Sequence, residues 1–222
     1  NRHSEGMIHN LSSHNSLVNH YVAQMRDVNF QNNRTLFRNN MERLGNIFAY
    51  EISRTFRYEA TDVETPLGVA KTSLSGDRVV LCTILRAGLP LHNGLLQFID
   101  WADNGFIAAY RKNHKDGTFE INLEYITCPD LNEAVLIITD PMLATGASIE
   151  RTIESLGDYG KYTQLHIVSI IASSHGVNHI RRLFPQAHLW VAAIDDELTA
   201  KSYIVPGLGD AGDLAFGKKM QE

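Results

Sequence analysis

The chain has 222 residues, a formal net charge of −5 and 44% hydrophobic residues, which is enough apolar material for the core of one domain. The negative charge is atypical of a nucleic-acid-binding surface, and no apolar run reaches the roughly 18 residues of a membrane-spanning helix. Two cysteines, Cys82 and Cys128, are too few for a disulfide framework and indicate reduced thiols in a cytoplasmic protein.

The N-terminal quarter of the chain predicts one long helix. Residues 1–6 precede Met7 and are interpreted as the remnant of an expression tag, so a single domain is expected over residues 7–222. A helix is predicted over about residues 36–56, with Thr35 as its N-cap. Its buried face is expected to consist of apolar residues at helical spacing: Met41, Leu44, Phe48, Ile52 and Phe56.

Strands and helices alternate along the rest of the chain. The predicted strands are residues 79–85, 106–110, 135–139, 165–172 and 189–194, and the predicted helices are residues 90–99, 147–159 and 177–184. This alternation predicts an α/β fold with a mostly parallel central sheet flanked by helices. One segment differs, because residues 112–129 combine a turn at 113–117 with alternating apolar residues, which predicts a β-hairpin arm.

The stretch from Val135 to Ser148 predicts a phosphate-binding site. A buried strand ends at Asp140, and open α/β sheets bind their ligands at such carboxyl ends. The small residues that follow let backbone N–H groups surround an anion at the start of the next helix. The loop consists of Asp140, Pro141, Met142, Leu143, Ala144, Thr145, Gly146, Ala147 and Ser148. It lacks the P-loop lysine, so the pattern alone leaves open an ordinary strand–turn–helix packed through small residues.

Two arginines follow predicted strands. Arg86 lies in the segment Ile84-Leu-Arg-Ala-Gly-Leu89, where small residues let the backbone turn sharply, and Arg111 ends the next strand. A guanidinium at such a place suits a pair of pyrophosphate oxygens. For Arg86, spacing alone favours a structural salt bridge at the edge of the sheet.

The C-terminal segment is a glycine-rich loop, Tyr203-Ile-Val-Pro-Gly-Leu-Gly-Asp-Ala-Gly-Asp-Leu-Ala-Phe-Gly217. It is too long for a simple turn, and long structured loops are usually functional. The alternative is a cluster of Gly and Asp turns, which does not explain the apolar residues between the glycines.

These motifs resemble those of uracil phosphoribosyltransferases. Residues 140–148 resemble the phosphoribosyl-pyrophosphate loop, residues 84–88 the pyrophosphate loop, and residues 203–217 the uracil-recognition tail. The three occur in the family's order, and the resemblance covers most of residues 14–217. It implies a type I phosphoribosyltransferase fold, a β-hairpin arm at about 112–129 and a base-recognition loop at about 203–217.

The resemblance implies an enzyme of pyrimidine salvage that joins uracil to phosphoribosyl pyrophosphate, giving UMP and pyrophosphate. Asp140 would bind ribose hydroxyls, and the loop as far as Ser148 would hold the 5′-phosphate. Arg86, Arg111 and Mg²⁺ would neutralise the departing pyrophosphate. Asp210 would meet the metal or the pyrophosphate through water. No convincing general base is present, and Asp210 is a weak candidate.

A planar pyrimidine needs an apolar wall and backbone partners for its carbonyls and ring N–H. Ile204 is expected to give the wall, and Gly209, Asp210 and Ala211 the backbone groups. A wrong base would leave buried backbone groups unpaired, at a cost of roughly 1–3 kcal/mol each, which is a basis for selectivity.

The resemblance further implies a homodimer or higher oligomer, and GTP activates some relatives. No nucleic-acid or membrane partner is expected. Three alternatives remain open from the sequence. They are a pyrimidine-responsive RNA-binding regulator, which would need a basic face, a phosphoribosyltransferase for another base, and a non-catalytic nucleotide-binding scaffold.

The sequence departs from the family at two positions and offers two histidines for interpretation. Ala147 replaces the usual glycine, which is tolerable where its φ is negative, and Lys112 replaces the asparagine after Arg111. His166 is interpreted as a structural residue within a strand, and His175 as a loop residue.

Overall fold

One central sheet organises the molecule, which is described here by a computed structural model covering residues 7–220. Residues 1–6, interpreted above as a tag remnant, lie outside the described residues. The strands are β1 (Ile8–Asn10), β4 (Val79–Leu85), β5 (Asp103–Asn113), β6 (Phe119–Thr127), β7 (Val135–Thr139), β8 (Met142–Leu143), β9 (Gln164–Ser173) and β10 (His188–Asp195). Their order is β1-β10-β9-β7-β4-β5-β6, with β8 beside β9. All neighbouring strands are parallel except β5 and β6, so the predicted fold class is confirmed.

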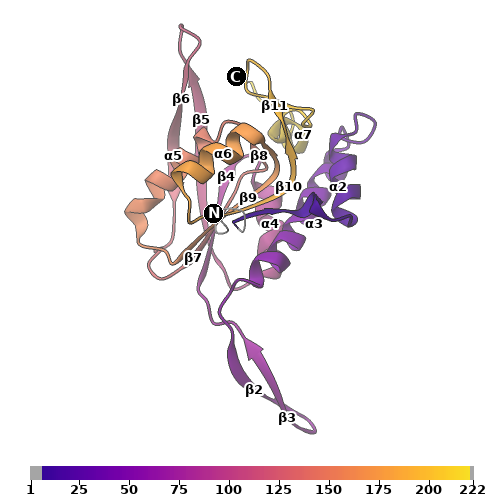
Figure 1. The fold of residues 1–222 in the computed structure, drawn as a ribbon, viewed down its shortest axis with the longest axis vertical. Coiled ribbons are helices and arrows are strands. Elements are labelled where there is room, and N and C mark those ends of the chain that lie inside the picture. Colours follow the sequence, from indigo (N-terminus) through magenta and orange to yellow (C-terminus); the bar gives the residue numbers. More distant parts are fainter. Residues whose placement is uncertain (1–6, 221–222) are drawn as a thin grey trace.

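Helices cover both faces of the sheet (Figure 1). On one face lie α2 (Leu17–Arg26), α3 (Arg34–Ser53) and α4 (Leu89–Phe98), and on the other lie α5 (Ala147–Leu156) and α6 (Ser174–Leu183). In β4, Leu81 packs into the first layer and Val80 into the second. Strands buried on both faces read as continuous apolar runs, which is why the predicted strands 79–85 and 135–139 match the structure.

The long helix differs from its prediction at both ends. It begins at Arg34 because the side chain of Asn33, not Thr35, accepts the backbone N–H of Leu36 at 3.0 Å. It ends at Ser53, and Phe56 is buried beyond the helix.

Other predicted boundaries also shift. The predicted helix 147–159 ends as α-helix at Leu156 and continues as the 3₁₀ turn η2 (Gly157–Tyr159). The predicted helix 177–184 begins at Ser174, because the side chain of Ser173 caps it through the N–H of Gly176. His175 therefore lies in a helix and not in a loop.

The predicted arm is a hairpin with different bounds. Its first strand is β5, which extends the predicted strand 106–110 in both directions, and its second strand is β6. Residues 114–118 form the turn, so residues 112–129 contain one strand and not a hairpin of their own. The arm projects from the same end of the molecule as the C-terminal segment (Figure 1).

Several elements were not predicted from the sequence, among them α2, β1, β2 (Glu59–Thr65) and β3 (Gly68–Leu74). Strands β2 and β3 form a second hairpin at the opposite end of the molecule (Figure 1). Nearly all of its residues are exposed, so no apolar alternation in the sequence predicts it. The short η1 (Leu11–Ser13) follows β1.

The C-terminal segment is more regular than the predicted loop. Strands β11 (Glu197–Leu198) and β12 (Ile204–Val205) pair, and α7 (Ala211–Phe216) follows. Cys82 and Cys128 are both free, as expected, with their Sγ atoms 3.9 Å apart. Over residues 7–220, none of the helices combines the length and the apolar character needed to span a bilayer.

We expect Gly94→Ala to destabilise the protein. A Cβ on Gly94 would lie 2.2 Å from the backbone oxygen of Glu42, where α3 and α4 cross in contact. Forcing these helices apart should cost about 1–3 kcal/mol, seen as a lower urea midpoint. Gly157→Ala is the control, since a Cβ there meets nothing within 4 Å. Equal midpoints for the two variants would contradict this packing.

Candidate active site

A cavity of about 190 Å³ opens where the chain leaves β7 and where the C-terminal segment folds back over the sheet. Two of the three sequence motifs contribute most of its wall. From the strand side come Ala87, Asp140, Met142 and Ala144, and from the C-terminal side come Ser202, Tyr203, Ile204, Gly209, Asp210, Ala211 and Gly212.

The loop after β7 is held to the neighbouring strand through its backbone. The carbonyl of Pro141 accepts N–H groups from Ile170 and Ile171 at 2.9 and 3.0 Å. The hydroxyl of Ser169 donates to the Asp140 carbonyl at 2.6 Å. Residues 142–143 form β8 beside β9, so the predicted cradle begins with a short strand that the small-residue pattern did not reveal.

The turn into α5 explains the departure at Ala147. Gly146 is the N-cap residue with φ 87°, the left-handed region that favours glycine, and Ala147 is the first residue of the helix. The hydroxyl of Thr145 accepts the N–H of Ala147 at 3.2 Å. Alanine at 147 is therefore unstrained.

The carboxyl group of Asp140 is poised between its two protonation states. Burial raises its pKa to about 7, and the N–H of Met142, 3.4 Å from Oδ1, only partly offsets this. A ligand that donates hydrogen bonds to this carboxyl would favour its ionised form.

Arg86 links the pyrophosphate motif to the C-terminal segment. Its guanidinium donates to the Gly217 carbonyl at 2.9 Å and to Asp213 at 3.4 Å. The peptide before Arg86 is cis. A Cβ on Gly88 would lie 2.1 Å from the Thr83 hydroxyl, so the turn after Arg86 requires glycine.

Arg111 stands apart from the cavity on the arm. Its guanidinium donates to the carbonyl of Lys201 at 3.3 Å and lies 4.1 Å from the centroid of the Phe119 ring. The structure thus brings Arg111 beside the residues that precede Tyr203, but Arg111 does not line the cavity.

Asp210 caps α7 and is engaged by a lysine. It accepts the N–H of Asp213 at 3.0 Å, and the Nζ of Lys219 lies 2.9 Å from its other oxygen. Burial pushes the pKa of Asp210 upward, but these hydrogen bonds and the lysine charge outweigh it and hold the pKa below its usual value. Such a carboxylate is a poor proton acceptor at neutral pH, which agrees with its weak candidacy as a base.

Several residues at the site were not predicted. Lys219 contacts both Asp210 and Asp213, and Arg26 and Asp195 bind the backbone of Gly207. Arg26 lies far from Gly207 in the sequence, and Lys219 lies outside the three motifs. No local sequence pattern therefore predicts these contacts.

The interpretation of His166 as structural is confirmed. The residue is buried, its Nδ1 accepts the indole N–H of Trp190 at 3.0 Å, and its other ring nitrogen lies 3.0 Å from the side chain of Gln164. Burial lowers its pKa to about 3, so this ring stays neutral within the sheet.

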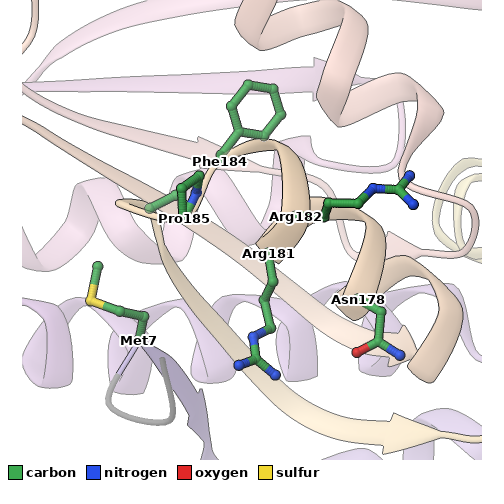
Figure 2. A pocket seen from close by; sticks show the side chains of 7 residues that line it. Met7, Asn178, Arg181, Arg182, Phe184 and Pro185 are labelled. Atoms are coloured by element: carbon green, nitrogen blue, oxygen red, sulfur yellow. The ribbon is translucent and has the colours of Figure 1, made fainter. Parts of the chain in front are cut away.

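A second hollow, of about 300 Å³, lies beside the end of α6 and the start of β10, at the amino ends of the strands. Figure 2 shows that the side chains of Arg181 and Arg182 point in different directions there. Residues of the sequence motifs do not line it, so it is not the candidate site. Its lining residues are Met7, Asn178, Arg181, Arg182, Phe184, Pro185 and Ala187.

Comparisons with known proteins agree with these motifs. The family described as uracil phosphoribosyltransferase matches residues 12–218. The chain is 50% identical over 211 residues to a uracil phosphoribosyltransferase of Porphyromonas gingivalis, which covers 95% of this chain and 98% of the relative. It is 38% identical over 203 residues to one of Thermococcus gammatolerans, which covers 90% and 89%. The solved AQ2163 protein of Aquifex aeolicus superposes with a TM-score of 0.85 at 29% identity, covering 97% of this chain and all of that one.

The raised pKa of Asp140 gives a pH-dependent stability. A folded-state pKa near 7, above the ordinary 3.8, means that the ligand-free protein loses stability as the pH rises from about 4 to 7. We expect Asp140→Asn to remove this loss, so that the variant melts higher than the wild type at about pH 8 and the gap narrows near pH 4. Calorimetry checks this, and a gap that is independent of pH would contradict the raised pKa.

Proposed function

Because the chain belongs to the uracil phosphoribosyltransferase family, we propose that uracil meets phosphoribosyl pyrophosphate in the cavity between the Asp140 loop and the C-terminal segment. The activity is that of a pentosyltransferase of pyrimidine salvage, EC 2.4.2.9, which forms UMP and pyrophosphate from these two substrates. The observation that supports the location is that one cavity is lined both by Asp140 and by the segment that ends in Gly209–Gly212.

In this proposal the loop after β7 binds the phosphoribosyl group. The 5′-phosphate is held by the backbone N–H groups of Ala144–Ser148 and by the hydroxyls of Thr145 and Ser148. The start of α5 also favours an anion there, because its N–H groups are aligned and its dipole is positive at that end. Asp140 accepts hydrogen bonds from the ribose hydroxyls, which keeps its carboxylate ionised despite its burial.

The base lies against the C-terminal segment. Ile204, which is buried, forms an apolar wall, and the backbone of Gly209–Ala211 offers donors and acceptors for the edge of uracil. Gly209 has φ 100°, and a Cβ there would meet nothing within 4 Å, so open space surrounds its backbone. A base that presents donors where uracil presents acceptors would leave the backbone groups of Gly209–Ala211 unpaired, and it would therefore bind more weakly.

Two arginines serve the leaving pyrophosphate. Arg86 already lies across the C-terminal segment, and its contacts to Asp213 and Gly217 can be exchanged for phosphate oxygens. Arg111, which contacts Lys201 from the arm, would have to exchange that contact for a pyrophosphate oxygen.

The residues present fit Mg²⁺ held mainly by pyrophosphate. Among residues 7–220 no three His, Cys, Asp or Glu side chains converge on a metal position. Mg²⁺ typically keeps several waters and uses one or two carboxylates together with substrate phosphates. Asp210 would hold it through water after releasing Lys219, and when bound the ion would neutralise pyrophosphate charge.

Catalysis then rests on charge and position. The bond from the anomeric carbon to pyrophosphate breaks ahead of attack by the uracil nitrogen, so positive charge develops on the ribose, and the Asp140 carboxylate stabilises it. As the carbon–nitrogen bond forms, the proton on that nitrogen passes to the departing pyrophosphate, whose oxygen becomes basic when its bond to carbon breaks. The depressed pKa of Asp210 argues against a role in removing the uracil proton. Fixing the two substrates in line supplies the remaining rate enhancement.

The remaining expectations are proposals of the same kind. We propose that residues 7–222 act as one domain, that the protein works as a homodimer or higher oligomer in the cytoplasm, and that GTP is an effector. The free thiols of Cys82 and Cys128 agree with a reducing compartment.

An assay with radiolabelled uracil, phosphoribosyl pyrophosphate and Mg²⁺ tests the function. We expect UMP to form, with no product when the metal is chelated and none from cytosine or hypoxanthine. Failure to form UMP, with GTP present or absent, would contradict the proposal.

Replacing Asp140 by Asn should lower kcat by about 100-fold or more, because a preorganised charge beside the reacting ribose is lost. Steady-state kinetics at saturating substrates measures this. Asp158→Asn, an exposed carboxylate in η2, is the matched control and should keep wild-type turnover. Unchanged turnover in the Asp140 variant would remove its assigned role.

A further inference from the structure

A partly buried ion pair contacts the C-terminal segment from outside the cavity. Arg26, the last residue of α2, donates from Nη1 and Nη2 to the two carboxylate oxygens of Asp195, at 2.7 and 2.9 Å. Asp195 is the last residue of β10, and its side chain is only 7% exposed. The pair therefore joins the first long element of the chain to the strand that leads into the C-terminal segment.

The same ion pair binds both backbone polar groups of one residue, Gly207. Asp195 Oδ2 accepts the N–H of Gly207 at 2.8 Å, and Arg26 Nη1 donates to the Gly207 carbonyl at 2.9 Å. The N–H and C=O of Gly207 are thus held between a fixed anion and a fixed cation. Charge-assisted hydrogen bonds of this type are shorter and stronger than neutral ones.

The position of Gly207 determines the position of the residues that line the cavity. Its φ is 51°, and a Cβ there would lie 2.1 Å from the Ile204 carbonyl, so the chain folds tightly back on itself. The next carbonyl, that of Leu208, accepts the side-chain amide of Gln31 at 3.0 Å. Holding Gly207 and Leu208 therefore fixes the distance between the Ile204 wall and the Gly209 backbone.

We propose that Arg26 and Asp195 are positioning residues that set the affinity for uracil by holding the backbone of the base-binding segment. This inference rests on the proposed function, in which residues 204–211 bind the base. Neither side chain lines the cavity, so both act through Gly207. A binding surface made of glycine backbone has no side chains of its own to pack. Its conformation is therefore fixed by contacts from neighbouring elements.

The charge state of Asp195 agrees with this role. Burial alone would raise its pKa, but the hydrogen bonds from Arg26 and from Gly207 outweigh burial and hold the pKa below its usual value. The carboxylate is therefore ionised whenever the enzyme works near neutral pH, and both of its oxygens accept hydrogen bonds.

The donor pattern predicts which replacements fail. Asp195→Asn puts an NH₂ group where an acceptor is needed, opposite either Arg26 or the N–H of Gly207. Arg26→Lys keeps the charge but cannot span both oxygens and the Gly207 carbonyl, so it should give a smaller effect in the same direction.

The test is the steady-state kinetics of Arg26→Gln, Asp195→Asn and Arg26→Lys. For the first two we expect the KM for uracil to rise at least tenfold, while kcat and the KM for phosphoribosyl pyrophosphate change less than about threefold; the lysine variant should lie between them and the wild type. A merely structural role would change all three parameters together and would overturn the proposal. An unchanged KM for uracil would overturn it as well.

Arg57→Gln is the matched control. Arg57 pairs with Asp77 at 3.4 Å, and Asp77 also accepts the backbone N–H of Arg57 at 2.9 Å, but this pair lies beside the start of β4. It should leave the KM for uracil unchanged, and a rise equal to that of Arg26→Gln would overturn the proposal.

If Arg26→Gln or Asp195→Asn does not fold, Gln31→Met replaces them, because it leaves the ion pair in place and removes the amide that links the Leu208 carbonyl to the carbonyls of Met25 and Arg26 at the end of α2. It should raise the KM for uracil selectively and speed amide exchange in residues 204–212, and the absence of both changes would overturn the proposal. Lack of turnover in the wild type would instead overturn the proposed function. Turnover in the wild type, together with an unchanged KM for uracil in the variants, would overturn the positioning role alone.

Discussion

Parallel pairing of β4, β7, β9 and β10 is the constraint on which the site depends. Parallel strands end at the same edge of a sheet, so the segments that follow them meet there whatever their separation in the chain. Arg86 follows β4, Asp140 follows β7, and the C-terminal segment follows β10. Because these strands are buried on both faces, their register cannot slip without exposing a core layer, and the positions of the three segments are fixed with it.

The C-terminal segment shows how a binding surface made of backbone is kept in shape. Its glycines allow close approach to a ligand but contribute no packing of their own, and side chains from distant elements replace that packing. Arg38 donates to the Ala215 carbonyl at 2.7 Å and Arg86 to that of Gly217, beside the ion pair of Arg26 and Asp195. Charge-assisted hydrogen bonds of this kind are stronger than neutral ones, so they can hold the segment against its conformational entropy.

Sequence analysis succeeded where a single physical signal dominates. Strands 79–85 and 135–139 are continuous apolar runs, and the loop from Asp140 to Ser148 combines small residues with a helix start, so both were predictable. The β2–β3 hairpin is exposed on both faces and gives no periodic signal. Contacts such as that of Arg26 with Asp195, 169 residues apart, depend on the tertiary fold, and no local pattern reveals them.

We propose that one cavity at this edge of the sheet binds the base and the phosphoribosyl group together. A crystal structure of the protein with UMP tests it most directly. We expect the 5′-phosphate at residues 144–148, the ribose hydroxyls at Asp140, and the uracil ring against Ile204 with its edge on the backbone of residues 209–211. UMP bound elsewhere, or bound here with its base turned away from the C-terminal segment, would contradict it.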